Sequence, residues 1–286
     1  MGRTFRARDG LALARRDWPS ADARGTIVIV HGLGEHIGRY AHVAARLNAS
    51  RWSVVGYDQR GHGASPGERG RLAAADDLLF DLAAVVDDVR AEASGPLVLL
   101  GHSLGGLVAA RFVAGALESP PPSWQRDVDA LVLSSPALSI GMTAAKRALL
   151  GALEALTPNL GIGNGLDATG ISRDAAVVAA YRADPLVHDR IAPRLVRFLA
   201  DAGPAVLALA PRWRVPTLLL YAGSDRLVVP AGSAAFAAAA PASVVTTREF
   251  PALFHEIFNE PEQEEVLSVL VDWLDTLPLS PIRSPR

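Results

Sequence analysis

The sequence contains no cysteine among its 286 residues. Disulfide bonds, cysteine-ligated metal sites and a cysteine nucleophile are therefore excluded, and the composition is compatible with a reducing compartment. An excess of charge of one sign is also missing, because 28 basic and 30 acidic residues leave a formal net charge of −2. This balance offers no electrostatic basis for binding nucleic acid or an anionic membrane.

Long apolar runs are absent as well. Residues 1–18 contain arginines without an apolar stretch behind them, so they do not resemble a secretory signal. The longest charge-free stretch, residues 227–247, is mostly alanine and serine and contains Pro230 and Pro241. A membrane-spanning helix needs about 20 predominantly apolar residues. We therefore expect a soluble, cytoplasmic protein whose contact with membranes is at most peripheral.

The residues that are present favour a single large α/β domain. Half are hydrophobic and a fifth are charged, as in a globular protein with a sizeable core. Domains usually have about 100–200 residues, and α/β folds reach about 250 as one unit. One catalytic domain that carries an insertion fits this length better than two independent domains.

Short apolar runs alternate with segments of helical periodicity. Most of these runs are continuous in valine, isoleucine and leucine, which is typical of parallel strands covered by helices on both faces. An antiparallel hairpin is predicted ahead of them, with strands Thr4–Arg8 and Leu11–Trp18 joined at Asp9-Gly10 by a type I′ turn. The predicted fold is therefore an α/β fold with a mostly parallel sheet flanked by helices. The further predicted strands are Thr26–Val30, Ser53–Tyr57, Leu97–Leu100, Ala130–Leu133, Thr217–Tyr221 and Val244–Phe250, and the predicted core helices are Asp76–Ser94, Leu104–Leu117 and Gln263–Leu277.

The interval between the strands near residues 133 and 217 is too long for a simple crossover. It contains helix-like pieces at Thr143–Leu156, Arg173–Ala183 and Ile191–Ala202 around a glycine-rich bend, residues 161–165. Long connections in compact domains are commonly functional lids. We predict a helical cap over residues 136–213, inserted into a core made of residues 1–135 and 214–286. The alternative is an insertion that only extends the core.

A nucleophile is predicted at Ser103. The sequence Gly101-His-Ser-Leu-Gly105 matches G-x-S-x-G, with a buried-strand pattern before it and a helical pattern after it. In that context the serine lies on a tight strand-to-helix turn with its hydroxyl exposed above the sheet. The alternative is an ordinary glycine-rich turn.

A serine hydroxyl needs an adjacent base. In this fold the triad residues follow in the order serine, acid, histidine. His255 lies after the last predicted strand and is the only histidine in the final third of the chain, and Asp225 follows the strand before it. We predict that His255 accepts the Ser103 proton and that Asp225 orients the imidazole. For the oxyanion hole we predict the backbone N–H groups of Leu104, directly after the nucleophile, and of Leu33, in the loop after the third strand.

Several segments extend this interpretation, because together they resemble the monoacylglycerol lipase family, also described as serine aminopeptidase S33-type hydrolases or lysophospholipases. The resemblance implies an eight-stranded sheet with a helical cap after strand six, and hydrolysis of esters that carry one fatty acyl chain. It implies the same triad and oxyanion residues, and a cap tyrosine, Tyr181, in contact with the glycerol head group. Leu104 departs from the methionine frequent at that position. The segments are His31-Gly-Leu-Gly-Glu-His-Ile-Gly-Arg-Tyr40, Tyr57-Asp-Gln-Arg-Gly-His-Gly-Ala-Ser65, Gly101-His-Ser-Leu-Gly-Gly106, Ile171-Ser-Arg-Asp174, Asp184-Pro-Leu-Val-His188, Gly223-Ser-Asp225 and His255-Glu-Ile-Phe-Asn-Glu260.

The expected partner is a small lipid ester, with transient contact between the cap and a membrane or micelle. Nucleic acid is excluded as a partner, and no oligomeric state is predicted. No His-Glu-x-x-His sequence or comparable cluster occurs, so neither a metal nor another cofactor is expected. Two alternatives stay open: the same mechanism acting on lysophospholipids, short-chain esters or thioesters, and a non-catalytic binding scaffold.

Overall fold

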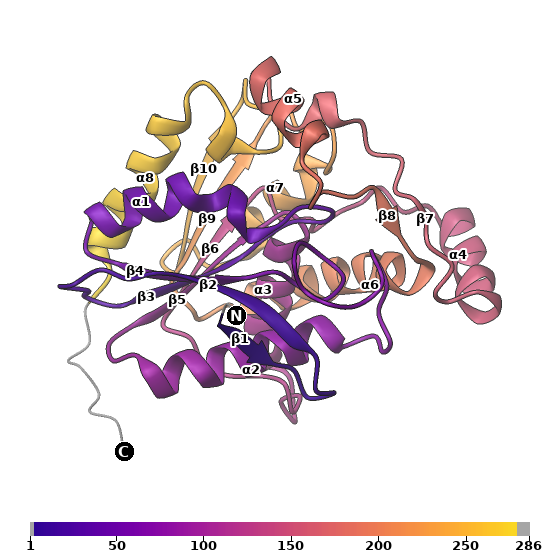
Figure 1. The fold of residues 1–286 in the computed structure, drawn as a ribbon, viewed down its shortest axis with the longest axis horizontal. Helices are drawn as coiled ribbons and strands as arrows, with labels where there is room; N and C mark the ends of the chain where they lie inside the picture. The colour runs from indigo at the N-terminus through magenta and orange to yellow at the C-terminus, as the bar shows by residue number, and fades with distance from the viewer. Residues whose placement is uncertain (1–2, 279–286) are drawn as a thin grey trace.

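The computed structural model describes residues 3–278, and an eight-stranded sheet forms its centre (Figure 1). The strand order is β1-β2-β4-β3-β5-β6-β9-β10. Strand β2 pairs antiparallel with both β1 and β4, whereas every pair from β4 to β10 is parallel. The prediction of a mostly parallel, eight-stranded α/β sheet is confirmed. The strands of this sheet are β1 (Thr4–Arg6), β2 (Ala12–Trp18), β3 (Thr26–Val30), β4 (Ser53–Tyr57), β5 (Leu97–His102), β6 (Ala130–Ser134), β9 (Thr217–Ala222) and β10 (Val245–Phe250), and β7 (Ile162–Gly163) pairs separately with β8 (Arg190–Ile191).

Helices cover both faces of the sheet, which explains the continuous apolar strands. In β3, Val28 and Val30 contribute to one buried cluster, whereas Ile27 and Ile29 contribute to the other. Helices α1 and α8 lie over the second face, and α2 and α3 lie over the first (Figure 1). The helices are α1 (Ala41–Ala49), α2 (Asp77–Glu92), α3 (Leu104–Ala114), α4 (Ala144–Leu156), α5 (Ala175–Ala183), α6 (Pro193–Leu209), α7 (Pro230–Ala239) and α8 (Gln263–Thr276), with short 3-10 helices η1 (Ile37–Tyr40), η2 (Gly115–Leu117), η3 (Ala168–Gly170), η4 (Ala210–Arg212) and η5 (Ile257–Asn259).

The leading hairpin is present, but the predicted type I′ turn is wrong. Gly10 has a left-handed φ of 88°, whereas Asp9 is not among the described residues with positive φ. The Gly10 N–H donates to Ala7 O and the Ala7 N–H donates to Leu11 O, each at 2.9 Å. This is a three-residue loop in which glycine alone takes the left-handed position. A type I′ turn would also force Asp9 into that conformation.

Helix α6 extends well beyond the predicted end at Ala202 and contains Pro204. A proline inside a helix costs about 3 kcal/mol. Burial of Leu195, Phe198 and Val206 in the same cluster as α3 outweighs this cost, because each large apolar side chain contributes about 1.5–3 kcal/mol. The helix also returns the chain across the sheet, as the parallel pair β6 and β9 requires.

The segment between β6 and α6 is much less buried. Helix α4 buries Leu150 alone and α5 buries no residue. Helix α4, β7 and β8 lie together at one edge of the molecule (Figure 1). The division into core and cap remains a prediction, and residues 1–2 and 279–286 of the predicted core lie outside the described residues. Among the helices of residues 3–278, none is both long enough and apolar enough to cross a membrane.

Candidate active site

Ser103 lies at the junction of β5 and α3, on a strained turn. Its φ of 52° and ψ of −118° are unusual for a residue with a side chain. Gly105 closes the turn against β3, because a Cβ there would lie 2.1 Å from Val30 O. The Ser103 N–H donates to Ser134 O, and its carbonyl accepts the Ala137 N–H, each at 3.0 Å. The sheet and this packing therefore hold the serine in its strained conformation.

Asp225 and His255 form a buried pair at the ends of β9 and β10. His255 Nδ1 lies 2.6 Å from Asp225 Oδ2. The other carboxylate oxygen accepts the N–H groups of Leu227 and Val228 at 2.8 and 2.9 Å. Burial opposes the charged carboxylate, but the bond to His255 lowers the pKa of Asp225. An ionised Asp225 fixes the proton of the imidazole on Nδ1 and leaves Nε2 as the acceptor nitrogen.

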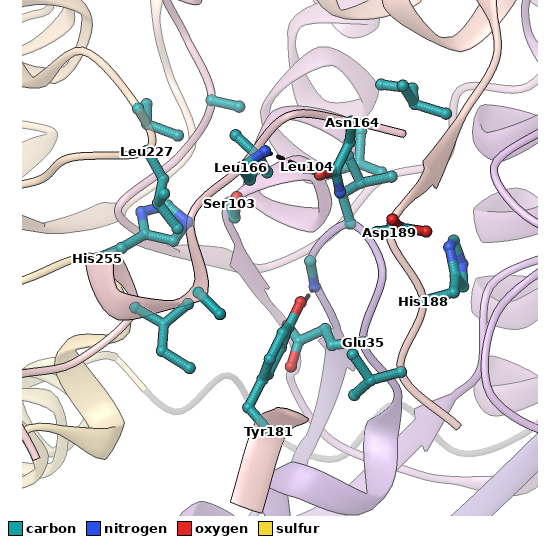
Figure 2. A pocket seen from close by; sticks show the side chains of 18 of the residues that line it. Glu35, Ser103, Leu104, Asn164, Leu166, Tyr181, His188, Asp189, Leu227 and His255 are labelled. Carbon is teal, nitrogen blue, oxygen red and sulfur yellow. Dashed lines mark hydrogen bonds between the residues drawn. The ribbon is translucent and has the colours of Figure 1, made fainter. Parts of the chain in front are cut away.

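Ser103 and His255 line the same cavity, and Figure 2 shows the two side chains close to each other on one side of it. No hydrogen bond joins the Ser103 hydroxyl to His255 within residues 3–278. Hydrogen bonds of this kind commonly tighten only when a substrate is bound. The structure thus brings serine, histidine and aspartate into one site, and their catalytic roles stay predictions.

Leu33 and Leu104 approach this cavity from two different elements. Leu104 is the first residue of α3, where backbone N–H groups have no partner within the helix. Leu33 lies in the loop after β3. Neither N–H donates to another protein group in the described part of the chain. Both groups are available to an anionic oxygen, as the predicted oxyanion hole requires.

His102 was not among the residues predicted for the site, because its side chain should diverge from Ser103. Its ring instead lies against His255, with 4.7 Å between the ring centroids. His102 Nδ1 lies 3.1 Å from both Ser134 O and Ser134 Oγ. Burial, and then the charge of His255, lower the pKa of His102 to about 4. A neutral His102 ring therefore packs beside His255, the candidate base.

Three buried charged residues next to the site were also missed by sequence reasoning. Arg39 lies 2.6 Å from Glu35 and forms two bonds to Glu256. Burial by itself would raise the pKa of the Glu35 carboxyl, but the Arg39 charge outweighs burial and lowers this pKa to about 2. The available signal was position: Glu35 follows the glycine-rich loop after β3, and Glu256 directly follows His255.

Tyr181 comes to the cavity from α5. Arg39 lies over its ring, 4.8 Å from the centroid. Burial and then the Glu35 charge raise the pKa of Tyr181. Figure 2 shows Tyr181 and Glu35 on the same side of the cavity. A neutral hydroxyl is thus held at the polar part of the site.

The cavity has a volume of about 690 Å³, within the usual range for small-molecule sites. Its walls are mixed, with an apolar set from several segments of the chain and a polar set around Ser103. No cluster of three or more histidine, aspartate or glutamate side chains suited to a metal ion occurs among the described residues. The apolar lining comprises Leu33, Leu104, Ala137, Ile140, Ile162, Leu166, Ala168, Ile171, Val187, Ile191, Val196, Leu199, Leu227 and Val228, and the polar lining includes Glu35, His102, Tyr181, Asp184, His188, His255 and Glu256.

Known proteins are similar to this chain over nearly its whole length. The family model described as serine aminopeptidase, S33, matches residues 21–262. The monoacylglycerol lipase of Mycolicibacterium smegmatis is 35% identical over 276 residues, which cover 95% of each chain. Phospholipase YtpA of Bacillus subtilis is 30% identical, covering 87% of this chain and 94% of its own. The crystal structure of Paleococcus ferrophilus monoacylglycerol lipase superimposes with a TM-score of 0.83 at 33% identity, covering 93% of this chain and 99% of that one.

Proposed function

Because the chain belongs to the serine aminopeptidase S33 family of α/β-hydrolases, we propose that it hydrolyses monoacylglycerol to glycerol and a fatty acid. The observation that carries this proposal is the 2.6 Å bond between His255 and Asp225, beside the strained Ser103 turn and in the same cavity. The identities of 35% and 33% to two monoacylglycerol lipases support the substrate.

The proposed reaction has two stages. The Ser103 hydroxyl attacks the ester carbonyl while His255 takes its proton, and the developing oxyanion accepts the N–H groups of Leu33 and Leu104. The bond to the glycerol oxygen then breaks, and His255 returns the proton to that oxygen. Water deprotonated by His255 attacks the acyl-enzyme, and the fatty acid leaves as Ser103 recovers its proton. Asp225 remains ionised throughout and stabilises the imidazolium.

The walls of the cavity support a lipid ester with one acyl chain. The apolar side chains, among them Ile162, Leu166 and Val196, suit the acyl chain. Tyr181, whose ring lies against the Arg39 guanidinium and which lines the cavity together with Glu35, suits the glycerol head group. We assign Tyr181 this binding role as part of the proposal.

The exposed apolar side chains of the insertion support transient contact with a membrane or micelle, from which such a substrate would come. Leu149 and Leu156 of α4 are 61% and 81% exposed, and Ile162 of β7 is 50% exposed. Cosedimentation with phosphatidylcholine vesicles, reduced in a Leu149→Glu/Leu156→Glu variant, tests this contact. A cytoplasmic location is also part of the proposal, supported by the absence of cysteine and testable by cell fractionation.

One observation favours a second candidate, a lysophospholipase. The 30% identity to phospholipase YtpA of Bacillus subtilis covers 87% of this chain. The chemistry would be unchanged, and only the head group at the polar end of the cavity would differ.

A fluorophosphonate probe tests the proposed serine mechanism, and a panel of esters tests the proposed substrate. We expect the probe to label Ser103 in the wild-type protein and to leave Ser103→Ala unlabelled. The panel compares monoacylglycerols with lysophospholipids and short-chain p-nitrophenyl esters. An unlabelled wild-type protein would overturn the mechanism, whereas labelling with faster turnover of lysophospholipids would replace the substrate.

A further inference from the structure

Two loops have to keep a fixed relation for the proposed reaction, and the sheet relates them only through intervening strands. The loop with Leu33 follows β3, and the loop with His255 follows β10. In the sheet, β5, β6 and β9 separate these two strands. No shared ladder of backbone hydrogen bonds therefore sets the distance between an oxyanion donor and the base. A direct connection between the two loops would hold this distance more closely.

Arg39, the third residue of η1, joins the two loops directly. Its Nη1 lies 2.6 Å from Glu35 Oε2 and 2.7 Å from Glu256 Oε1, and its Nη2 lies 2.6 Å from Glu256 Oε2. Arg39 and Glu256 are 217 residues apart in the chain. A guanidinium that binds a carboxylate through two nitrogens fixes orientation as well as distance.

Each carboxylate is in turn tied to a residue of the proposed chemistry. Glu35 Oε1 accepts the N–H of Gly32 at 2.6 Å, and Gly32 directly precedes Leu33. The same oxygen accepts the Tyr40 hydroxyl at 2.7 Å. Glu256 directly follows His255, and its N–H donates to Ile171 O at 2.8 Å. The Arg39 guanidinium is thus connected through Glu35 to Gly32, the neighbour of Leu33, and it binds Glu256, the neighbour of His255.

The surroundings of these charges make the connection rigid. The side chains of Glu35, Arg39 and Glu256 are 4%, 12% and 6% exposed, so water screens them little. The ring of Tyr181 lies against the guanidinium. Glu35 stays ionised at neutral pH, since the Arg39 charge holds its pKa at about 2 despite burial. A buried guanidinium between two carboxylates has few other arrangements that leave no charge unpaired.

We propose that Arg39 is a positioning residue for the ester hydrolysis, holding the Leu33 N–H through Glu35 and the His255 imidazole through Glu256. This inference rests on the proposed function of Ser103 and His255. Arg39 does not touch the reacting atoms in this arrangement. It keeps the oxyanion hole and the base in register, so its loss lowers the rate of acyl transfer more than it weakens binding of the substrate.

The chain offers a matched control in Arg60. Its guanidinium binds Asp81 through two nitrogens, each at 2.6 Å, and also contacts Asp77 at 3.1 Å. The side chains of Arg60, Asp77 and Asp81 are 5%, 4% and 1% exposed, so these three members are as buried as the Arg39 cluster, and Asp9, a fourth partner at 3.0 Å, is 39% exposed. None of its members lines the cavity. Arg60→Lys therefore reports the effect of weakening a buried ion cluster away from the site.

The experiment compares Arg39→Lys, Arg39→Gln, Glu256→Gln, the double variant Arg39→Gln/Glu256→Gln and Arg60→Lys. For each we measure Tm, kcat and KM with a monoacylglycerol, and the rate of fluorophosphonate labelling of Ser103. We expect Arg39→Gln to lower kcat and the labelling rate by about 10²-fold, as a displacement of about 1 Å does, with a small change in KM. Arg39→Lys keeps the positive charge but loses the planar guanidinium that binds a carboxylate through two nitrogens. Its kcat and labelling rate should therefore lie between those of Arg39→Gln and the wild type. The double variant should lose little more than Arg39→Gln, because both changes break one connection.

Other outcomes distinguish the positioning role of Arg39 from the proposed hydrolytic function. If the Arg39 variants lose Tm as Arg60→Lys does but keep the wild-type labelling rate, the positioning role is overturned and the proposed function stands. Additive losses in the double variant would also overturn it. A wild-type protein that the probe does not label would overturn the proposed function and the positioning role together. Labelling without turnover of monoacylglycerol would replace the substrate alone, and the labelling rates would still decide the role of Arg39.

Discussion

Ser103 has a side chain in a backbone conformation that glycine normally occupies. Its φ of 52° is one of three positive values outside glycine among residues 3–278. Residues held in such regions store about 1–3 kcal/mol each and persist where the surroundings over-determine them. Here the surroundings are the bonds to Ser134 and Ala137 and the close packing at Gly105. The strain supports the proposed role, because it keeps the hydroxyl above the sheet.

Two substitutions at this position separate strain from chemistry. Ser103→Ala and Ser103→Gly both remove the hydroxyl, and each should lower kcat by about 10⁴-fold or more. Only glycine removes the Cβ from the strained region, at a cost in unfolded-chain entropy of about 0.5–1 kcal/mol. We expect Ser103→Gly to be more stable than Ser103→Ala by about 1 kcal/mol in urea denaturation. A less stable glycine variant would show that the turn is not strained.

At the scale of elements, glycines in two helices have opposite surroundings. Gly203 of α6 packs against the chain after β6, and a Cβ there would lie 2.3 Å from Leu138 O. Gly151 of α4 has no atom within 4 Å of such a Cβ. Alanine gains about 1 kcal/mol over glycine from helix propensity at both sites. Tertiary packing decides the difference between them.

The same substitution should therefore change sign between the two helices. Gly203→Ala should lower the free energy of unfolding by about 1–3 kcal/mol, because the backbone oxygen of Leu138 cannot move aside cheaply. Gly151→Ala should raise it by about 0.5–1 kcal/mol. Urea denaturation of both variants measures the two effects. Equal effects would mean that α6 is not packed as closely as the structure has it.

Elements with local signals were predictable from the sequence, whereas those that depend on distant residues were not. Strand β3 was predicted with its observed bounds, because a strand buried on both faces has to be apolar throughout. Helix α6 was predicted too short, because Pro204 is a stop signal whose cost is outweighed by burial against α3. The Ser103 turn could be predicted from its glycines. The connection between Arg39 and Glu256 could not, because nothing local indicates that residues 217 positions apart meet.

At the scale of the whole molecule, a stack of histidines joins the loops after β3 and β4 to the segment between α5 and β8. The ring centroids of His31 and His62 are 5.4 Å apart, and those of His62 and His188 are 4.7 Å apart. Burial lowers the pKa of each, in His188 to about 4, with the nearby Arg69 acting in the same direction. His188 also donates its backbone N–H to Gly34 O in the oxyanion loop. Protonation of this stack would bring like charges together where His31 and His62 are buried from water.

Stability should accordingly fall in mild acid. Above the unfolded-state pKa of about 6.5, both folded and unfolded histidines are neutral. As the pH falls from there toward about 4, the unfolded chain binds protons that the folded chain does not, so the free energy of unfolding decreases. His188→Asn keeps an acceptor for the Arg190 N–H and should give a shallower decline between pH 6.5 and 4.5 than the wild type. Identical declines would exclude His188 from this effect.

The order of the strands along the chain also determines when each residue of the candidate site is made during translation. Leu33 and Ser103 follow β3 and β5, which lie at the centre of the sheet, whereas His255 follows β10, the last strand and an edge of the sheet. Translation adds about 5–20 residues per second, and the N-terminal parts of a chain can fold first. A nascent chain that has completed β6 therefore holds the proposed nucleophile and both oxyanion donors but no base. The proposed triad is therefore complete only after the segment that follows β10, with His255, has been made and has packed against Asp225.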